Sequence, residues 1–277
     1  MSWSDSLQLV EAGGVRLRVQ VRGSGPPLLL IMGIGAPLEM WAPLLEHLPG
    51  RTAIVFDAPG TGESTQPRLP LRMRDVAAIT DSMVDQLGYD QVDVLGISFG
   101  GFLAQQLAYQ APARVRRLIL AATAPGFGAI PGNPFALLAL MTPLRYYSPT
   151  FLRLIAPHVY GGKQTLDAKA RATVVELYRR RPPSLRGYLG QLWSVTGWTS
   201  LPFLHRIGQP TMIVAGDDDP LAPLINARFM AWRMPDARLE VIKGGGHLFV
   251  IERAAQLAML VEDFLSESTS GHGSRVA

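Results

Sequence analysis

The stretch Val-Asp-Val-Leu-Gly-Ile-Ser-Phe-Gly-Gly, residues 92–101, places Ser98 between Gly96 and Gly100. The apolar residues before it are typical of a buried strand, and those after it are compatible with a helix. This G-x-S-x-G pattern needs glycines because the serine lies on a very tight strand-to-helix turn with a strained backbone. The chain has 28 glycines, so chance could supply the pattern, and the surrounding sequence must support it.

Predicted strands and helices alternate on both sides of this stretch. Residues 15–21 alternate apolar and polar side chains, and Gly13 and Gly14 separate them from the run 7–10, which predicts an antiparallel hairpin. Further strands are expected at 28–32, 52–56, 115–121, 211–215 and 238–242, and helices at 76–87, 101–109, 224–234 and 252–265, with an amphipathic segment at 41–48. This alternation predicts an α/β fold with a doubly wound, mostly parallel sheet.

The alternation stops between residues 125 and 200, which are rich in proline, leucine, methionine and aromatic residues. We expect this segment to be an inserted helical lid over a core made of residues 1–124 and 201–265. Residues 266–277 are polar and contain glycine, and we expect a disordered tail there.

Composition excludes several classes of site. The chain has 277 residues and no cysteine, so disulfides, thiolate metal sites and cysteine nucleophiles are excluded. No apolar run is long enough to span a bilayer and no secretion signal begins the chain, so we expect a cytoplasmic protein without a transmembrane segment.

The net charge of +4 is concentrated between residues 145 and 186, where we count nine basic and two acidic residues. We interpret this segment as a solvated helix face; the alternative is attraction to an acidic surface or to an anionic end of a substrate. No nucleic-acid-binding motif accompanies the charge, so a nucleic-acid partner is not expected.

Acyl transfer through a serine needs a nucleophile, a base and a carboxylate that orients the base. Ser98 is the candidate nucleophile, and His247 is the candidate base because it follows the last predicted strand, after three glycines that leave its loop free to turn. Three consecutive aspartates follow the strand at 211–215, and spacing alone does not choose between them. We select Asp219 over Asp217 and Asp218, with Asp57 as a more distant alternative.

The negative charge that develops on the attacked carbonyl oxygen requires backbone N–H donors. The candidates are the N–H of Phe99, which follows the nucleophile, and that of Ile34, which lies in the glycine-containing loop after the strand at 28–32. No metal or cofactor is required. Apolar side chains of the lid and one beside the candidate base are the candidates for substrate binding: Phe135, Met141, Trp193, Trp198 and Leu248.

These motifs resemble those of the α/β-hydrolase superfamily over nearly the whole chain, through residues 57–64 (Asp-Ala-Pro-Gly-Thr-Gly-Glu-Ser), 96–100 and 216–220 (Gly-Asp-Asp-Asp-Pro). Residues 155–162, 197–200 and 215–233 are also similar to the intracellular depolymerases of medium-chain-length polyhydroxyalkanoates. The resemblance implies a Ser-Asp-His triad, favours Asp219 as its acid, and implies association with polymer granules.

The leading hypothesis is therefore a serine esterase that hydrolyses medium-chain-length poly(3-hydroxyalkanoate) through an acyl-enzyme. An apolar lid would equally suit an esterase, lactonase or thioesterase for small apolar acyl substrates. The same triad could also transfer the acyl group to another acceptor, as in an acyltransferase or perhydrolase. A binding protein on an inactive scaffold is disfavoured because all three reacting residue types are present.

Overall fold

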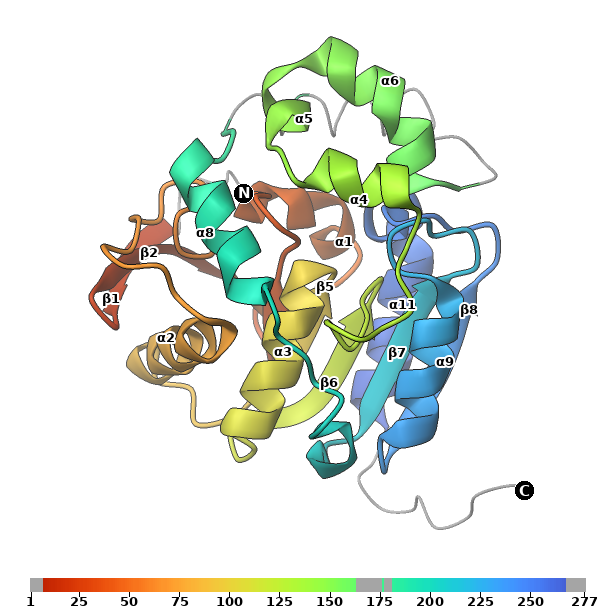
Figure 1. Cartoon of the computed structure of the whole chain (residues 1–277). Helices are drawn as coiled ribbons and strands as arrows, with labels where there is room; N and C mark the ends of the chain where they lie inside the picture. The colour runs from red at the N-terminus through yellow and green to blue at the C-terminus, as the bar shows by residue number, and fades with distance from the viewer. Residues whose placement is uncertain (1–6, 163–175, 177–180, 268–277) are drawn as a thin grey trace.

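The computed structural model describes residues 7–162, 176 and 181–267, and its centre is one eight-stranded sheet (Figure 1). The strand order is β1-β2-β4-β3-β5-β6-β7-β8. β1 pairs antiparallel with β2, and β2 with β4, whereas all the later pairings are parallel. The predicted α/β class, the N-terminal hairpin and the mostly parallel sheet are confirmed. The strands span Leu7–Ala12, Val15–Arg22, Pro27–Ile31, Thr52–Phe56, Val92–Ile97, Val115–Ala121, Thr211–Gly216 and Ala237–Ile242 for β1 to β8.

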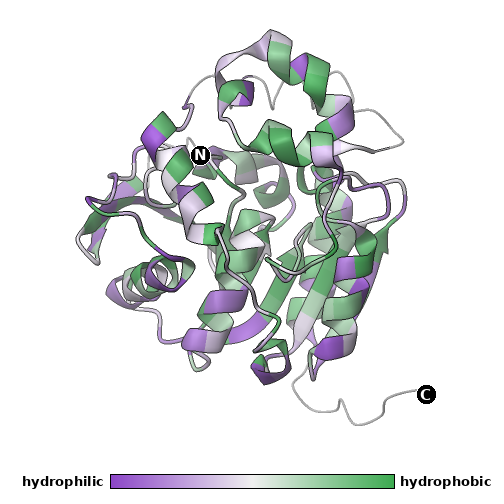
Figure 2. Ribbon diagram, in the orientation of Figure 1, coloured by the Kyte–Doolittle hydropathy of each residue, from purple (hydrophilic) through white to green (hydrophobic). Residues whose placement is uncertain are grey.

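Helices cover both faces of the sheet, which explains the uninterrupted apolar runs of the inner strands. In β3, Leu28 and Leu30 pack into the layer that contains α1 (Ala42–Leu45) and α11 (Ala254–Ser266). Leu29 and Ile31 alternate with them and pack into the opposite layer. That layer contains α2 (Met73–Gln86), α3 (Phe99–Gln110) and α9 (Leu224–Arg233). Figure 2 shows the strands in green between helices whose purple faces point outward.

Four helices of the described chain lie between β6 and β7 in sequence, above the sheet in Figure 1. We call them the insertion: α4 (Pro134–Leu140), α5 (Leu144–Tyr147), α6 (Pro149–Tyr160) and α8 (Leu185–Val195). Asn133, Ser148 and Ser184 cap α4, α6 and α8, each accepting hydrogen bonds from backbone N–H groups of the first turn. Two short 3₁₀ helices complete the description, η1 (Leu38–Trp41) and η2 (Leu204–Arg206).

The C-terminal part differs from the sequence prediction in two respects. The helix expected at 252–265 is α11, which begins at Ala254, and a separate short helix, α10 (Phe249–Glu252), precedes it. The first two residues of the tail expected from 266 are ordered, since Ser266 is still in α11 and Glu267 forms an ion pair with Arg238. The rest of that expected tail lies outside the described residues. No helix in the described part of the chain is long and apolar enough to cross a membrane.

Candidate active site

Ser98 lies in the turn between β5 and α3, with φ 54° and ψ −116°. Such angles strain a residue that carries a β-carbon. The two neighbouring glycines cannot be replaced without a clash, because a β-carbon would lie 2.2 Å from the Gly100 carbonyl oxygen at Gly96, and 2.0 Å from the Ile31 carbonyl oxygen at Gly100. The sequence folds here into the tight turn that the G-x-S-x-G pattern predicts, and it presents Ser98 at the carboxyl edge of the sheet.

His247 contacts both Ser98 and Asp219. Its Nε2 lies 3.0 Å from Ser98 Oγ, and its Nδ1 lies 2.8 Å from Asp219 Oδ2. His247 and Asp219 are both buried. An ionised carboxylate only accepts hydrogen bonds, so Nδ1 carries the proton and Nε2 accepts from the Ser98 hydroxyl. The other carboxylate oxygen, Oδ1, accepts from the N–H groups of Leu221 and Ala222 at 2.8 and 2.9 Å, which fixes the carboxylate.

The three consecutive aspartates have three different partners. Asp217 Oδ1 accepts from the Gly244 N–H at 2.6 Å, on the loop that leads to His247. Asp218 Oδ2 accepts from the Gly162 N–H at 3.0 Å, just beyond α6. Of the three, Asp219 is the one that contacts His247 in the described structure. The structure therefore brings Asp219, the predicted acid, against His247, whereas Asp217 and Asp218 are bonded to backbone of adjacent loops.

Asp57, the more distant alternative, belongs to a different network. Its Oδ1 accepts from the Leu38 N–H at 2.8 Å, and its Oδ2 accepts from Arg18 Nη1 at 3.1 Å. Burial raises the pKa of Asp57 to about 6, although the hydrogen bond from Leu38 and the charge of Arg18 oppose the shift. These contacts make Asp57 a buried structural carboxylate that fixes the turn after β4.

Two backbone N–H groups lie beside Ser98 without a hydrogen-bond partner in the described chain, those of Ile34 and Phe99. Phe99 directly follows Ser98 at the start of α3. Ile34 follows Gly33, whose position places an added β-carbon 3.7 Å from Ser98 Cβ, so this loop passes close to the nucleophile. Both predicted donors therefore belong to segments that lie next to Ser98.

The insertion holds the peptide unit between Ile34 and Gly35 at both of its polar ends. The hydroxyl of Tyr146 on α5 donates to the Ile34 carbonyl oxygen. The side-chain oxygen Oε1 of Gln191 on α8 accepts from the Gly35 N–H at 2.7 Å. Burial raises the pKa of Tyr146, so its hydroxyl stays protonated and able to donate. Sequence reasoning missed Tyr146 and Gln191, because neither carries a motif and both act across more than 100 residues.

A small cavity of about 50 Å³ opens beside Ser98 and His247. Leu248, a predicted substrate contact, lines it, as does Tyr160 at the end of α6. The Tyr160 hydroxyl is buried and has no hydrogen-bond partner among the described residues, so it is free to bond to a polar atom of a ligand. The Tyr160 carbonyl oxygen accepts from the His247 N–H at 2.6 Å, which ties α6 to the loop of the base.

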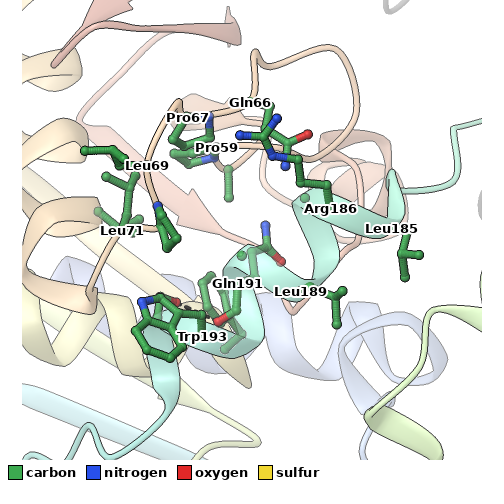
Figure 3. Close-up of a pocket in the computed structure, with 17 residues that line it drawn as sticks. Pro59, Gln66, Pro67, Leu69, Leu71, Leu185, Arg186, Leu189, Gln191 and Trp193 are labelled. Atoms are coloured by element: carbon green, nitrogen blue, oxygen red, sulfur yellow. Dashed lines mark hydrogen bonds between the residues drawn. The ribbon is translucent and has the colours of Figure 1, made fainter.

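Trp193 lines a second, larger cavity of about 490 Å³ between α8 and the loop of residues 58–71 (Figure 3). The other three predicted contacts line neither cavity. Trp198 packs against Phe102, with ring centroids 5.2 Å apart, and its indole N–H donates to Gln106. Phe135 and Met141 are exposed on and just after α4. Phe135 and Met141 are therefore exposed to solvent and Trp198 packs against α3, so none of the three lines a described cavity.

The basic segment is only partly the solvated face that we expected. Arg153 and Arg186 are exposed, whereas Arg145 is buried and donates to the Tyr188 hydroxyl at 2.7 Å. Arg181 forms ion pairs with Glu39 and Glu63 of the core. The remaining basic residues lie outside the described residues: Lys163, Lys169, Arg171, Arg179 and Arg180.

The mostly parallel sheet and the hydrogen-bonded Ser98, His247 and Asp219 at its carboxyl edge are typical of α/β hydrolases. The sequence pattern of the α/β hydrolase fold family matches residues 26–254, and the chain belongs to this family. The chain is a hydrolase, and its relatives include esterases.

One relative is a poly(3-hydroxyalkanoate) depolymerase of Ectopseudomonas oleovorans, 44% identical over 262 residues, which cover 93% of this chain and 92% of that protein. Another is a pimeloyl-[acyl-carrier protein] methyl ester esterase of Aromatoleum aromaticum, 31% identical over 86% of this chain and 97% of that protein. The fold is similar to that of the enol-lactonase of Burkholderia xenovorans LB400, with a TM-score of 0.80 at 21% identity, over 94% of this chain and 100% of that one.

Proposed function

We propose that this chain is a serine esterase that hydrolyses medium-chain-length poly(3-hydroxyalkanoate). The observation that carries the proposal is the hydrogen-bonded chain from Asp219 through His247 to Ser98 at the carboxyl edge of the sheet. The 44% identity to a poly(3-hydroxyalkanoate) depolymerase along nearly the whole chain supports the polyester as the substrate.

In the first half of the reaction, Ser98 Oγ attacks the ester carbonyl carbon while His247 Nε2 takes the hydroxyl proton. Asp219 stabilises the resulting imidazolium through Nδ1. The carbonyl oxygen becomes an oxyanion that accepts from the Ile34 and Phe99 N–H groups, each worth about 3 kcal/mol in the transition state. The tetrahedral intermediate then collapses, and the alcohol leaves with the proton from His247.

In the second half, a water molecule gives its proton to His247 Nε2 and attacks the acyl-enzyme. The same two N–H groups receive the second oxyanion. Collapse returns the proton to Ser98 Oγ and releases a carboxylic acid. A free 3-hydroxy acid or a shortened polymer with a carboxylate end is the expected product. The reaction needs no metal or cofactor.

The insertion would act as a lid that shapes the substrate site. Its residues Tyr146 and Gln191 contact the Ile34–Gly35 peptide, and Tyr160 contributes a buried hydroxyl beside Ser98. The exposed Arg153 and Arg186 make electrostatic binding to a negatively charged polymer granule in the cytoplasm physically reasonable. Such binding would weaken as salt is added, because exposed charges are screened.

The test is clearing of an emulsion of medium-chain-length polyhydroxyalkanoate. The wild type should clear it and release 3-hydroxy acids, whereas Ser98→Ala should not. A fluorophosphonate probe should label the wild type and leave Ser98→Ala unlabelled, which shows that the nucleophile is Ser98. Hydrolysis of small soluble esters without any polymer cleavage would contradict the polyester assignment.

A second candidate is an esterase for small acyl substrates. The cavity beside Ser98 holds about 50 Å³, and one relative is an esterase for a methyl ester. This candidate predicts that kcat/KM is highest for short soluble esters, lactones or thioesters and falls steadily with acyl length. Comparison of water with alcohols and hydrogen peroxide as acceptors would test whether the same triad transfers acyl groups instead.

A further inference from the structure

The larger cavity lies between α8 and the loop of residues 58–71, and we call it the α8 groove. In Figure 3, Pro59, Pro67, Leu69 and Leu71 of the loop lie on the same side of α8 as Gln191 and Trp193. Leu185 and Leu189 also line the cavity, but they extend from the side of α8 away from the loop. Its volume, about 490 Å³, is within the range of ligand sites, roughly 300–1,000 Å³. The cavity beside Ser98 is far smaller, at about 50 Å³. An alkyl chain of medium length therefore has room in the α8 groove and not beside the triad.

The wall of the α8 groove includes the residue that follows Ser98 in the chain. Phe99, whose N–H is a proposed oxyanion donor, is buried and forms part of the groove wall. Gln191 forms another part, and its amide binds the Gly35 N–H on one side and Thr61 on the other. Gln191 thus contacts both the α8 groove and the Ile34–Gly35 loop.

The mouth of the α8 groove exposes apolar surface that water disfavours. Leu69, Leu185, Leu189 and Trp193 are 76%, 58%, 49% and 44% exposed. Contiguous exposed apolar side chains mark binding sites on soluble proteins. Three prolines in the loop, Pro59, Pro67 and Pro70, restrict its backbone, so a ligand would order little of the wall on binding.

We infer that the α8 groove is a subsite for the alkyl side chain of a polyester repeat next to the one that Ser98 attacks; this inference rests on the proposed function. Successive side chains of a 3-hydroxyalkanoate polyester are separated by four backbone bonds, about 5 Å. Ser98 and Phe99 are neighbours in the chain, and Phe99 lines the groove. We therefore place one repeat at the triad and the alkyl side chain of the adjacent repeat in the groove. Arg186 and Gln66 at the rim are placed to donate to ester carbonyl oxygens of the same polymer.

Gly190 offers a way to fill the groove. It lies on α8, three residues after Gly187 and four before Ser194, so the three share one helix face, and all three line the groove. A β-carbon at Gly190 would meet no atom within 4 Å. Gly190→Phe therefore places a ring in the groove, and the loss of a helical glycine favours folding.

The experiment compares kcat/KM for a trimer of 3-hydroxyoctanoate with kcat/KM for p-nitrophenyl butyrate. Gly190→Phe should lower the ratio about 30-fold, as expected when about half of a pentyl chain can no longer leave water. Gly190→Ala, which keeps the groove open, should change the ratio less than about fourfold, about the loss expected for displacing one methylene. Gly208→Phe is a matched control at an exposed glycine whose β-carbon also meets no atom within 4 Å, and it should leave the ratio unchanged.

Binding of the same trimer to Ser98→Ala, measured by calorimetry, gives a readout without catalysis. Adding Gly190→Phe should weaken this binding by a similar factor. A wild-type ratio that Gly190→Phe does not change would overturn the subsite while leaving the esterase intact. A wild type that cleaves p-nitrophenyl butyrate and not the trimer would overturn the polyester assignment itself. If Gly190→Phe cleared polymer emulsions more slowly than the wild type but cleaved the trimer normally, the groove would instead adsorb to the polymer surface. That result would also overturn the subsite.

Discussion

Replacement of Ser98 by glycine should stabilise the protein relative to replacement by alanine. Ser98 has φ 54° and ψ −116°, where a β-carbon costs about 1–3 kcal/mol. Glycine removes this strain. Glycine also gives the unfolded chain more conformational freedom than alanine does, which lowers the free energy of unfolding by about 0.4–1 kcal/mol and offsets part of this gain. We therefore expect the free energy of unfolding of Ser98→Gly to exceed that of Ser98→Ala by about 1 kcal/mol. Both variants should be inactive.

The measurement is guanidinium denaturation of the two variants, supported by their thermal midpoints, which should differ by about 2–4 °C. A second pair, Ser82→Gly and Ser82→Ala, is the control, since Ser82 lies within α2 at ordinary helical geometry. There alanine should be more stable by about 1 kcal/mol. The sign should therefore reverse between the two positions. Equal stability at position 98, or greater stability of Ser98→Ala, would refute the strain argument.

Three further predictions concern the site and its supports. Asp219→Asn should lower kcat about 10³–10⁴-fold, because the imidazole of His247 loses its orienting charge, whereas Asp218→Asn should lower it less than about tenfold, since its partner is a backbone N–H. Tyr146→Phe should lower kcat about tenfold or more with little change in KM, because one oxyanion donor loses its support. Asp57→Asn should flatten the pH dependence of stability between about pH 4 and 6.

The sign of the last prediction follows from the raised pKa. Folded Asp57 titrates at about 6 and the unfolded residue near 3.8, so between these values the folded state holds a proton that the unfolded state has lost. The free energy of unfolding of the wild type should therefore fall by about 3 kcal/mol as the pH rises through this window. Denaturation at several pH values compares the two proteins, and parallel pH curves would contradict the assignment.

Specific outcomes would contradict the predictions for Asp219 and Tyr146. If Asp218→Asn and Asp219→Asn lost activity equally, the orienting role of Asp219 would be wrong. If Tyr146→Phe kept the wild-type kcat, the insertion would have no part in the oxyanion site. Steady-state kinetics on p-nitrophenyl butyrate measures both.

Local patterns were enough to predict the sheet, and they also predicted which residues the structure brings together at its carboxyl edge. β4 and β6 have the predicted bounds, 52–56 and 115–121, because buried parallel strands leave continuous apolar runs. Ser98 and His247 follow strands and have glycines nearby, so motif and strand position both identified them. Spacing could not separate the three aspartates, since they are consecutive residues just after the same strand. Their different hydrogen-bond partners are visible only in the structure.

The insertion could not be predicted in the same way. Arg145 was expected to be solvated with the other basic residues, but Tyr188, more than 40 positions later, covers it. The direction of an aromatic side chain depends on how its segment packs, so Trp193 on α8 lines the α8 groove while Trp198, which follows α8, packs on Phe102. The sequence also did not predict the break at Arg253 between α10 and α11, because the helical spacing of apolar residues continues through it.

The two contacts that the insertion makes with the Ile34–Gly35 peptide restrict how this protein can be recombined. In a chimaera that exchanges the insertion with that of a relative, substrate range and turnover would not be inherited independently. A donor segment without a hydroxyl at the Tyr146 position and an amide at the Gln191 position would bring a new pocket and lose the support of the Ile34–Gly35 peptide. Those two residues therefore belong with the core in any graft, although they are encoded within the exchanged segment.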